Sequence, residues 1–245
     1  MPEPMAETRR KTAVERAADR LREDILTGRY AIGDRLPGER DLSATLGVSR
    51  LTLRSALTRL ESEGIVRAVH GSGNLVTDYR ETGGIGLLGH LSALALSGHD
   101  AVPLSTLGEV LEMRRAISVE ALGLATERCT PEVLRALRRQ VMSMRDHLSD
   151  AHRFMEADLQ FARHVVRATQ NIGYELVFNT VQRATHDNPA LELAYFANAA
   201  RTVEVYDRLI ELMEKGDPRR VRDLASRLLT RLDRQTLGAI GALPA

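Results

Sequence analysis

The sequence predicts a mainly α-helical protein with two domains and one small β-hairpin. Three observations support this prediction. Apolar residues recur at helical spacing near the N-terminus and again from residue 87 to the end. Only residues 65–76 change to alternating apolar and polar positions, around a Gly-Ser-Gly turn that is typical of a two-stranded hairpin. Leucine and alanine dominate the composition, whereas aromatic residues make up 4% and tryptophan is absent.

The N-terminal domain is predicted over residues 10–78. Four residues at helical spacing mark its first helix, which ends at Gly28: Val14, Ala18, Leu21 and Ile25. A short helix over residues 39–46 is broken by Gly47, and a third helix runs from Ser49 to about residue 63. Gly64 then stands where a glycine relieves a left-handed helix cap. Helix, tight turn, helix and hairpin together form a winged helix-turn-helix.

The start of the third helix is predicted to be exposed. Its core face is formed by four residues at helical spacing: Leu53, Ala56, Leu57 and Leu60. Polar residues remain at the N-terminal end, where free N–H groups and partial positive charge suit phosphate: Ser49, Arg50, Thr52, Arg54 and Ser55.

Arg50 and Arg54 are four residues apart and therefore project from the same side of this helix. Two guanidinium groups placed in this way match the O6 and N7 acceptors of guanine in the major groove. A surface helix with two arginines is more often simply solvated. The joint occurrence of the helix-turn-helix, the glycine-rich hairpin and His70 at its tip favours DNA binding instead.

The string LPGERDLSATLGVSRLTLRSALTRLESEGIV, followed by HGSGN, resembles the N-terminal domain of the GntR family of bacterial transcription regulators. The resemblance implies that Arg50 and Arg54 read guanines and that His70 and Gly71 enter the minor groove. It also implies phosphate contacts by three further residues: Arg40, Ser49 and Thr52. Leu51 stands where many relatives have a threonine, which puts one phosphate contact in doubt.

Length, charge and cysteine content exclude several classes of protein. A chain of 245 residues is long enough for two domains with separate cores. The formal net charge is only +1, so any contact with DNA must come from the local placement of charge. Cys129 is the single cysteine, which excludes an intramolecular disulfide and fits a reducing cytoplasm, and its position at a helix boundary disfavours a catalytic nucleophile. No apolar run approaches the roughly 20 residues of a membrane span, and we expect no membrane partner.

Residues 79–86, YRETGGIG, are predicted to link the two domains because adjacent glycines weaken regular structure. An ordinary loop is the alternative to a hinge at this point. Residues 87–245 are predicted to form an all-helical bundle, since no β-alternation of comparable length appears. Breaks at glycines and prolines divide it into predicted helices over residues 104–127, 131–150, 152–168, 172–186, 190–215 and 218–237. Thr130 is expected to cap the helix in which Pro131 takes a first-turn position.

The bundle resembles the ligand-sensing FCD domain of the FadR branch of the same family. The match is clearest in LEMRRAISVEALGLATER, EADLQFARHVVRATQN and MEKGDPRRVRDLASRLL. Many members of this branch hold a divalent metal with one Asp and three His. This chain keeps Asp158, but Ala162, Tyr206 and Leu228 stand where histidines would be needed. We therefore predict no metal and no other cofactor.

The lost ligands, together with ETGGIGLLGHL and AYFANAAR, resemble the type that binds fatty acyl-CoA without metal. Ala162 would leave room for an alkyl chain, and Arg114 matches an arginine that meets the polar end of the ligand. Asp158, Tyr195 and Asn198 complete the expected effector site. The alternatives are that Arg114 only pairs with a nearby glutamate, Glu109 or Glu112, and that Tyr195 only packs.

The predicted function is a homodimeric regulator that binds a palindromic double-stranded DNA operator and responds to a small-molecule effector, a fatty acyl-CoA. A sensor of small organic acids, with a water or metal bridge at Asp158, is the first alternative. An enzyme is the second, but we find no Ser-His-Asp spacing, no phosphate-binding glycine loop and no paired carboxylates. The sequence leaves open the operator, the regulated genes, activation or repression, and the identity and effect of the effector.

Overall fold

The protein was studied as a computed structural model that describes residues 11–71, 73–186, 196 and 198–241. The chain divides into two compact units, Met1–Leu87 and Leu88–Ala245. Both are built mainly from helices, and the only sheet in the described residues is a two-stranded antiparallel hairpin. The predicted fold class is confirmed. Each unit is described by itself below.

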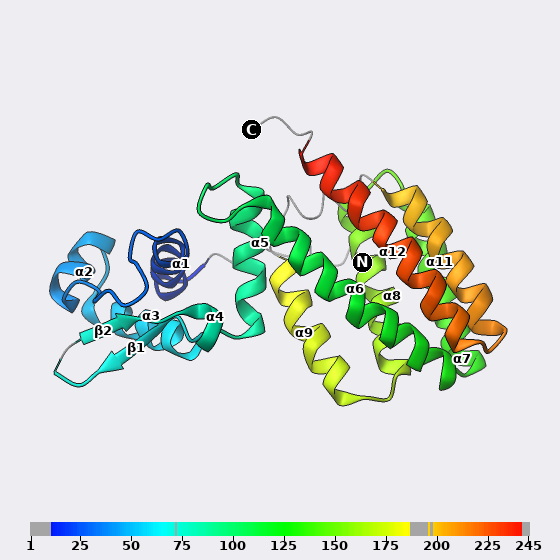
Figure 1. The fold of residues 1–245 in the computed structure, drawn as a ribbon, viewed down its shortest axis with the longest axis horizontal. Helices are drawn as coiled ribbons and strands as arrows, with labels where there is room; N and C mark the ends of the chain where they lie inside the picture. The colour runs from blue at the N-terminus through cyan, green and yellow to red at the C-terminus, as the bar shows by residue number, and fades with distance from the viewer. Residues whose placement is uncertain (1–10, 72, 187–195, 197, 242–245) are drawn as a thin grey trace, which may run out of the picture. The chain divides into compact units, whose positions relative to one another are not determined.

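The N-terminal unit contains the three helices and the hairpin that the sequence predicts (Figure 1). Its elements are α1 (Ala13–Leu26), α2 (Glu39–Leu46), α3 (Arg50–Ser62), β1 (Val66–Val69) and β2 (Gly73–Val76). Helix α1 begins with a capping box, in which Thr12 and Glu15 each accept a hydrogen bond from the other's backbone N–H. Gly47 ends α2 in the left-handed conformation, with φ 64°, and so allows the sharp turn into α3.

Two contacts with β2 place α2 next to the hairpin. The N–H of Gly33 donates to the carbonyl oxygen of Val76, and the N–H of Leu36 donates to that of Asn74, both at 2.9 Å. The segment before α2 therefore runs beside β2 and forms an isolated bridge between Arg35 and Leu75. As a result, the backbone fixes the start of α2 relative to the hairpin.

A buried ion pair joins α1 to the C-terminal end of α3. Arg22 is 1% exposed, and its Nε and Nη2 atoms donate to the two carboxylate oxygens of Glu63 at 2.7 and 2.8 Å. Its Nη1 atom donates to Asp19 at 2.7 Å. Burial acts to lower the pKa of the Arg22 guanidinium, but the hydrogen bonds and charges of Glu63 and Asp19 outweigh it and raise that pKa. This bidentate geometry is the kind that stabilises a buried charge.

The segment predicted as a linker contains more regular structure than expected. Tyr79–Thr82 forms a short helix, α4, capped by Asp78, and Ile85–Leu87 forms a 3₁₀ turn, η1. The hydroxyl of Thr82 donates to the carbonyl oxygen of Gly64 at 2.6 Å, which holds α4 against the end of α3. The adjacent glycines were correctly expected to interrupt helix, but the residues on either side use local hydrogen bonds to form helical turns.

The C-terminal unit is a helical bundle around the long helix α6 (Figure 1). Its helices are α5 (Leu88–Leu96), α6 (Leu104–Glu127), α7 (Pro131–Asp146), α8 (Ala151–Ala168), α9 (Ile172–His186), α11 (Ala199–Glu214) and α12 (Pro218–Gly241). Helix α6 packs against α5, α8 and α12, and α7 packs against α8 and α11. Among the described helices, none has the length and apolar character that crossing a bilayer would require.

The helix boundaries in this unit follow the predicted breaks, with three differences. Thr130 caps α7 at Pro131, as predicted, but the helix ends at Asp146 because the N–H of His147 bonds to Met144 instead of continuing the helix. The helix predicted over residues 190–215 is described only from Ala199, with Asn198 as its N-cap. Residues 190–195 lie outside the described residues. Helix α12 continues past residue 237 to Gly241.

Gly64 provides a test of how α4 packs on α3. It has φ 77°, and a Cβ atom at this position would overlap the carbonyl oxygen of Thr82. We expect Gly64→Ala to lower the free energy of unfolding by about 2 kcal/mol or more, through strain and the clash together. Urea denaturation followed by circular dichroism measures this.

Gly28 is the matched control, because it has nearly the same φ, 78°, with nothing near the added Cβ. Gly28→Ala should cost only the conformational strain. Equal losses in the two variants would contradict a role for close packing at Gly64.

Candidate DNA-binding surface and effector site

The first turn of α3 is exposed, as the sequence predicts. Its core face is buried through Leu53, Ala56, Leu57 and Leu60, of which all but Leu57 are fully inaccessible. Arg50 and Arg54 lie on the opposite, exposed face. The hydrophobic core of the unit therefore holds α3 with its N-terminal arginines toward solvent.

A carboxylate of α2 holds one of these arginines. The Nε atom of Arg54 lies 2.8 Å from Oε2 of Glu39, and the two side chains are 67% and 36% exposed. Exposed ion pairs of this kind contribute little, up to about 1 kcal/mol, so DNA can replace the pair at small cost. Glu39 thus orients the guanidinium of Arg54 without burying it.

The three residues expected to contact phosphate have different environments. Arg40 lies in the first turn of α2, is highly exposed and has its Nε atom 3.2 Å from Asp41. Ser49 is the N-cap of α3 and accepts a hydrogen bond from the N–H of Thr52 at 3.1 Å, while their hydroxyl groups are 2.8 Å apart. Ser49 and Thr52 therefore have a structural role in capping, and their phosphate contacts remain a prediction.

The tip of the hairpin carries His70 and Gly71. The pairing of Val69 with Gly73 leaves a three-residue turn, in which His70 and Gly71 are exposed and Gly71 has φ 71°. A positive φ favours glycine at this position. An exposed imidazole beside a residue without a side chain suits insertion into a minor groove, and this contact remains a prediction.

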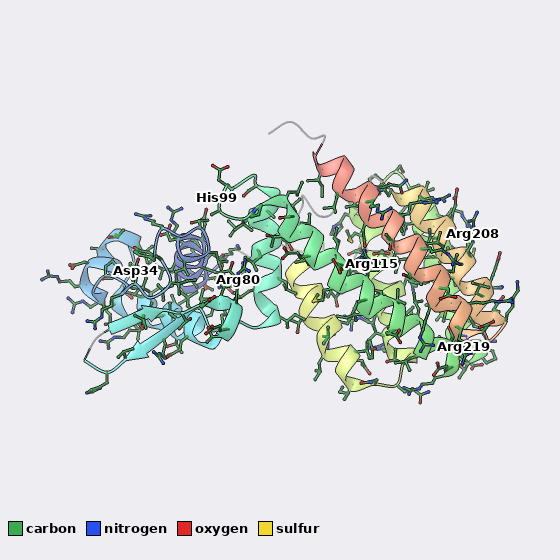
Figure 2. All side chains as sticks on the ribbon, viewed as in Figure 1. Asp34, Arg80, His99, Arg115, Arg208 and Arg219 are labelled. Atoms are coloured by element: carbon green, nitrogen blue, oxygen red, sulfur yellow. The ribbon has the colours of Figure 1, made fainter. Side chains whose placement is uncertain are left out.

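In the C-terminal unit, Arg114 pairs with a different carboxylate from those expected. Its Nη2 atom donates to Oδ1 of Asp233 on α12 at 2.8 Å, whereas the alternative to an effector contact named a nearby glutamate, Glu109 or Glu112. Arg115, labelled in Figure 2, donates to the second oxygen of Asp233 at 2.6 Å. Asp233 is only 4% exposed. Two arginines of α6 thus share one buried carboxylate of α12.

Asp158 on α8 lies near this pair and bonds directly to α11. The hydroxyl of Tyr206 donates to Oδ1 of Asp158 at 2.7 Å, and the ring of Tyr206 stacks on Phe161 with centroids 4.1 Å apart. Burial raises the pKa of the Asp158 carboxyl, although the Tyr206 hydrogen bond and the charge of Arg114 act in the opposite direction. Arg114, Asp158 and Tyr206 therefore form one polar group inside the bundle.

The remaining expected effector residues are less closely connected to this group. Asn198 donates from Nδ2 to the hydroxyl of Thr236 at 3.3 Å, one helical turn from Asp233 on α12. Ala162 is half-buried on α8, one turn after Asp158. Tyr195 lies outside the described residues. Within the described part of the chain, no three His, Cys, Asp or Glu side chains are grouped as metal ligands.

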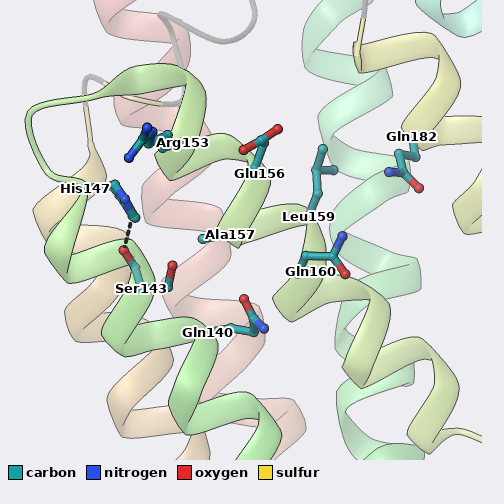
Figure 3. Close-up of a pocket in the computed structure, with 9 residues that line it drawn as sticks. All are labelled: Gln140, Ser143, His147, Arg153, Glu156, Ala157, Leu159, Gln160 and Gln182. Carbon is teal, nitrogen blue, oxygen red and sulfur yellow. Dashed lines mark hydrogen bonds between the residues drawn. The ribbon is translucent and has the colours of Figure 1, made fainter. Parts of the chain in front are cut away.

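A groove of about 600 Å³ lies elsewhere, across the surface of α7, α8 and α9 (Figure 3). It is lined by Gln140, Ser143, His147, Arg153, Glu156, Ala157, Leu159, Gln160 and Gln182. None of the expected effector residues lines it. Its polar side chains and open form do not match the apolar cavity that an acyl chain requires.

Reasoning from the sequence assigned no role to Glu39, Asp233 or the hydroxyl of Tyr206. A signal was present for Asp233, because it falls within the buried stripe of α12 between Leu232 and Thr236. A carboxylate on such a stripe must be paired, since burial of an isolated charge is costly. The partner itself lies more than 100 residues earlier, and no local pattern indicates it.

Two family models match the chain. Residues 13–76 match "Bacterial regulatory proteins, gntR family", and residues 109–231 match "FCD domain". The transcriptional regulator Mce2R of Mycobacterium tuberculosis is 30% identical over 220 residues, which is 90% of each chain. A fatty acid metabolism regulator protein of Klebsiella pneumoniae is 30% identical over 211 residues, which is 81% of this chain and 85% of the relative.

A solved structure supports the fold. Lar, which controls the agr system of Listeria monocytogenes, superposes with a TM-score of 0.63 at 18% identity, over 92% of this chain and 97% of its own.

Arg54 provides a test of base reading. We expect Arg54→Ala to weaken binding to a preferred duplex by about 1–3 kcal/mol and to have little effect on random DNA, because a bidentate contact with guanine is lost. Fluorescence anisotropy at fixed salt measures both. Arg20→Ala, at an exposed arginine of α1, is the control and should leave both affinities nearly unchanged. Equal weakening on random DNA would show that Arg54 contacts only phosphate.

Asp158 provides a test of the buried polar group. Its pKa is higher in the folded state than the ordinary 3.8, so rising pH favours unfolding over a window that starts near 3.8 and ends above the raised value. Asn does not titrate. We therefore expect the free energy of unfolding of Asp158→Asn, relative to the wild type, to increase across this window by about 1.4 kcal/mol for each unit of the shift.

Urea titrations at several pH values measure this difference. Asp223→Asn, at an exposed position of α12, is the control and should give no comparable trend. A relative stability of Asp158→Asn that is constant or falls with pH would contradict the raised pKa.

Proposed function

The chain belongs to the GntR family of bacterial regulatory proteins, and from this premise we propose that it binds a palindromic operator as a homodimer and responds to a fatty acyl-CoA. It is a DNA-binding transcription regulator with an FCD domain, and its relatives are regulators, not enzymes. We place its action in the cytoplasm, where operator DNA is found.

The exposed start of α3 is the observation that carries the DNA-binding proposal. Arg50 and Arg54 project from it together, and the hairpin adds His70 and Gly71 at a second exposed point of the same unit. One such unit contacts few base pairs and discriminates weakly. Two copies on a two-fold symmetric site double the contacts, which supports a homodimer on a palindrome.

The polar group around Arg114 supports an anionic effector. Arg114 is a half-buried cation that already pairs with a carboxylate, and a guanidinium binds phosphate or carboxylate groups in the same geometry. Tyr206 stands where metal-binding relatives need a histidine, and its hydroxyl bonds to Asp158. A relative with 30% identity is named a fatty acid metabolism regulator, which favours an acyl-CoA among anionic effectors.

Competition between the effector and Asp233 for Arg114 would couple effector binding to the packing of α6 on α12. An anion that binds Arg114 replaces Asp233 as its partner and so changes the contact between α6 and α12. Two states of the bundle would then differ in this contact and in their affinity for the effector. An effector that prefers one state shifts the population toward that state. If the two states differ in affinity for DNA, the effector changes DNA affinity, and DNA changes effector affinity by the same factor.

A small organic acid is the second candidate effector. The observation that favours it is the polar character of the group, in which Arg114 and Tyr206 carry hydrogen-bond donors for a compact carboxylate. Such a ligand would need no long apolar cavity.

Operator affinity with and without palmitoyl-CoA tests the acyl-CoA proposal. We expect a change of about 5- to 150-fold, the usual range of allosteric coupling. Free coenzyme A is the matched control, because it carries the phosphates without the acyl chain. An unchanged affinity would exclude a long-chain acyl-CoA, and a response to short dicarboxylates instead would support the second candidate. Native mass spectrometry of the same samples tests the dimer, and a monomer on operator DNA would contradict it.

A further inference from the structure

Leu51 is the most exposed large apolar side chain in the described part of the protein. It is 77% exposed, whereas Ile172, the next, is 68% exposed and lies in the other unit. Single exposed leucines are common on protein surfaces, so exposure alone indicates nothing. The exposure of Leu51 is informative because this residue lies on the helix that is predicted to bind DNA.

Leu51 lies in the first turn of α3, between Arg50 and Thr52. In a helix it shares a face with the residues three and four positions later, which are Arg54 and Ser55. The hydroxyl of Ser55 donates back to the carbonyl oxygen of Leu51 at 3.2 Å. The buried residues of α3 lie on the other side, so Leu51 is near the centre of the exposed face.

This face combines one apolar side chain with two guanidinium groups. In the major groove, guanine offers acceptors to arginine, and thymine alone among the bases presents an apolar C5-methyl group. Leu51 and Arg54 are separated by about 4.5 Å along the helix axis, which is between one and two base-pair steps of about 3.4 Å. A leucine placed there meets a methyl group beside the guanine that Arg54 reads.

We propose that Leu51 determines specificity by packing against the C5-methyl group of a thymine within one or two base pairs of that guanine. This inference rests on the proposed reading of bases by α3. The proposed contact with thymine explains why an apolar residue stands at a position where contact with solvent or phosphate would favour a polar side chain. Leu51 then disfavours cytosine at this position, because cytosine has hydrogen in place of the methyl group.

Deoxyuridine isolates this contact, since it differs from thymidine only by the missing methyl group. A preferred duplex is first selected from a random library with the full-length wild type, and each thymine of one half-site is then replaced in turn. We expect one position at which the replacement weakens wild-type binding roughly fourfold, the effect of one methyl group removed from an apolar contact. Leu51→Ala should bind the two duplexes equally.

Ile32→Ala is the matched control, because Ile32 is another exposed apolar residue of the same unit, at 60%. This variant should keep the wild-type sensitivity to deoxyuridine. Alanine is compatible with the first turn of α3, so circular dichroism should show that Leu51→Ala is folded.

The outcomes separate the two proposals. If the wild type selects no preferred duplex, base reading by α3 fails, and the inference on Leu51 fails with it. If a preferred duplex is found but no thymine is sensitive, or Leu51→Ala retains the sensitivity, only the inference on Leu51 is overturned. A change in self-association of Leu51→Ala without a change in deoxyuridine sensitivity would likewise overturn it and indicate a contact between copies of the chain.

Discussion

The buried pairing of Arg22 with Glu63 is the constraint on which the DNA-binding surface depends. Glu63 is the C-cap of α3, and both of its carboxylate oxygens accept from Arg22 of α1. Loss of Glu63 would remove two of the three hydrogen bonds of the buried Arg22 guanidinium and leave Asp19 as the remaining partner, at a cost of up to about 3 kcal/mol. The ion pair fixes the C-terminal end of α3 against α1, and the buried apolar face of α3 keeps its N-terminal arginines toward solvent.

The two ends of α3 therefore use charge differently. At the C-terminal end the ion pair is buried, bidentate and supported by Asp19. At the N-terminal end, Arg54 and Glu39 form an exposed pair that water and salt weaken. A helix that reads bases needs a fixed attachment to its domain at one end and exposed side chains at the other end that can exchange a protein partner for DNA. Leu51 contributes to the same exposed surface without using charge.

The bundle also depends on charged groups, but these join several helices. Arg114 and Arg115 of α6 hold Asp233 of α12, and Asp158 of α8 accepts from Tyr206 of α11. These contacts add specific partners to the close packing of the apolar core. Buried polar contacts have specific partners, so a ligand that replaces one partner changes a defined contact. This property makes the group around Arg114 suitable for sensing an anion.

The sequence by itself determined the fold class, the helix-turn-helix with its hairpin and most helix boundaries. These features depend on local rules: apolar spacing, the caps at Ser49 and Thr130, and a glycine with positive φ at Gly64. It also indicated which residues of α3 would be exposed, since a helical period divides core from solvent. The family resemblance added the roles expected of Arg114 and Asp158.

Only the tertiary structure decided which side chains are partners. Arg114 and Asp233 are 119 residues apart, and Asp158 and Tyr206 are 48 apart, so no local pattern connects them. The same holds for Arg22 with Glu63 and for Glu39 with Arg54. Periodicity specifies the face of a helix on which a residue lies, but the facing residue is set by how whole helices pack. Local chemistry therefore fixed the elements of this protein, and packing fixed its buried contacts.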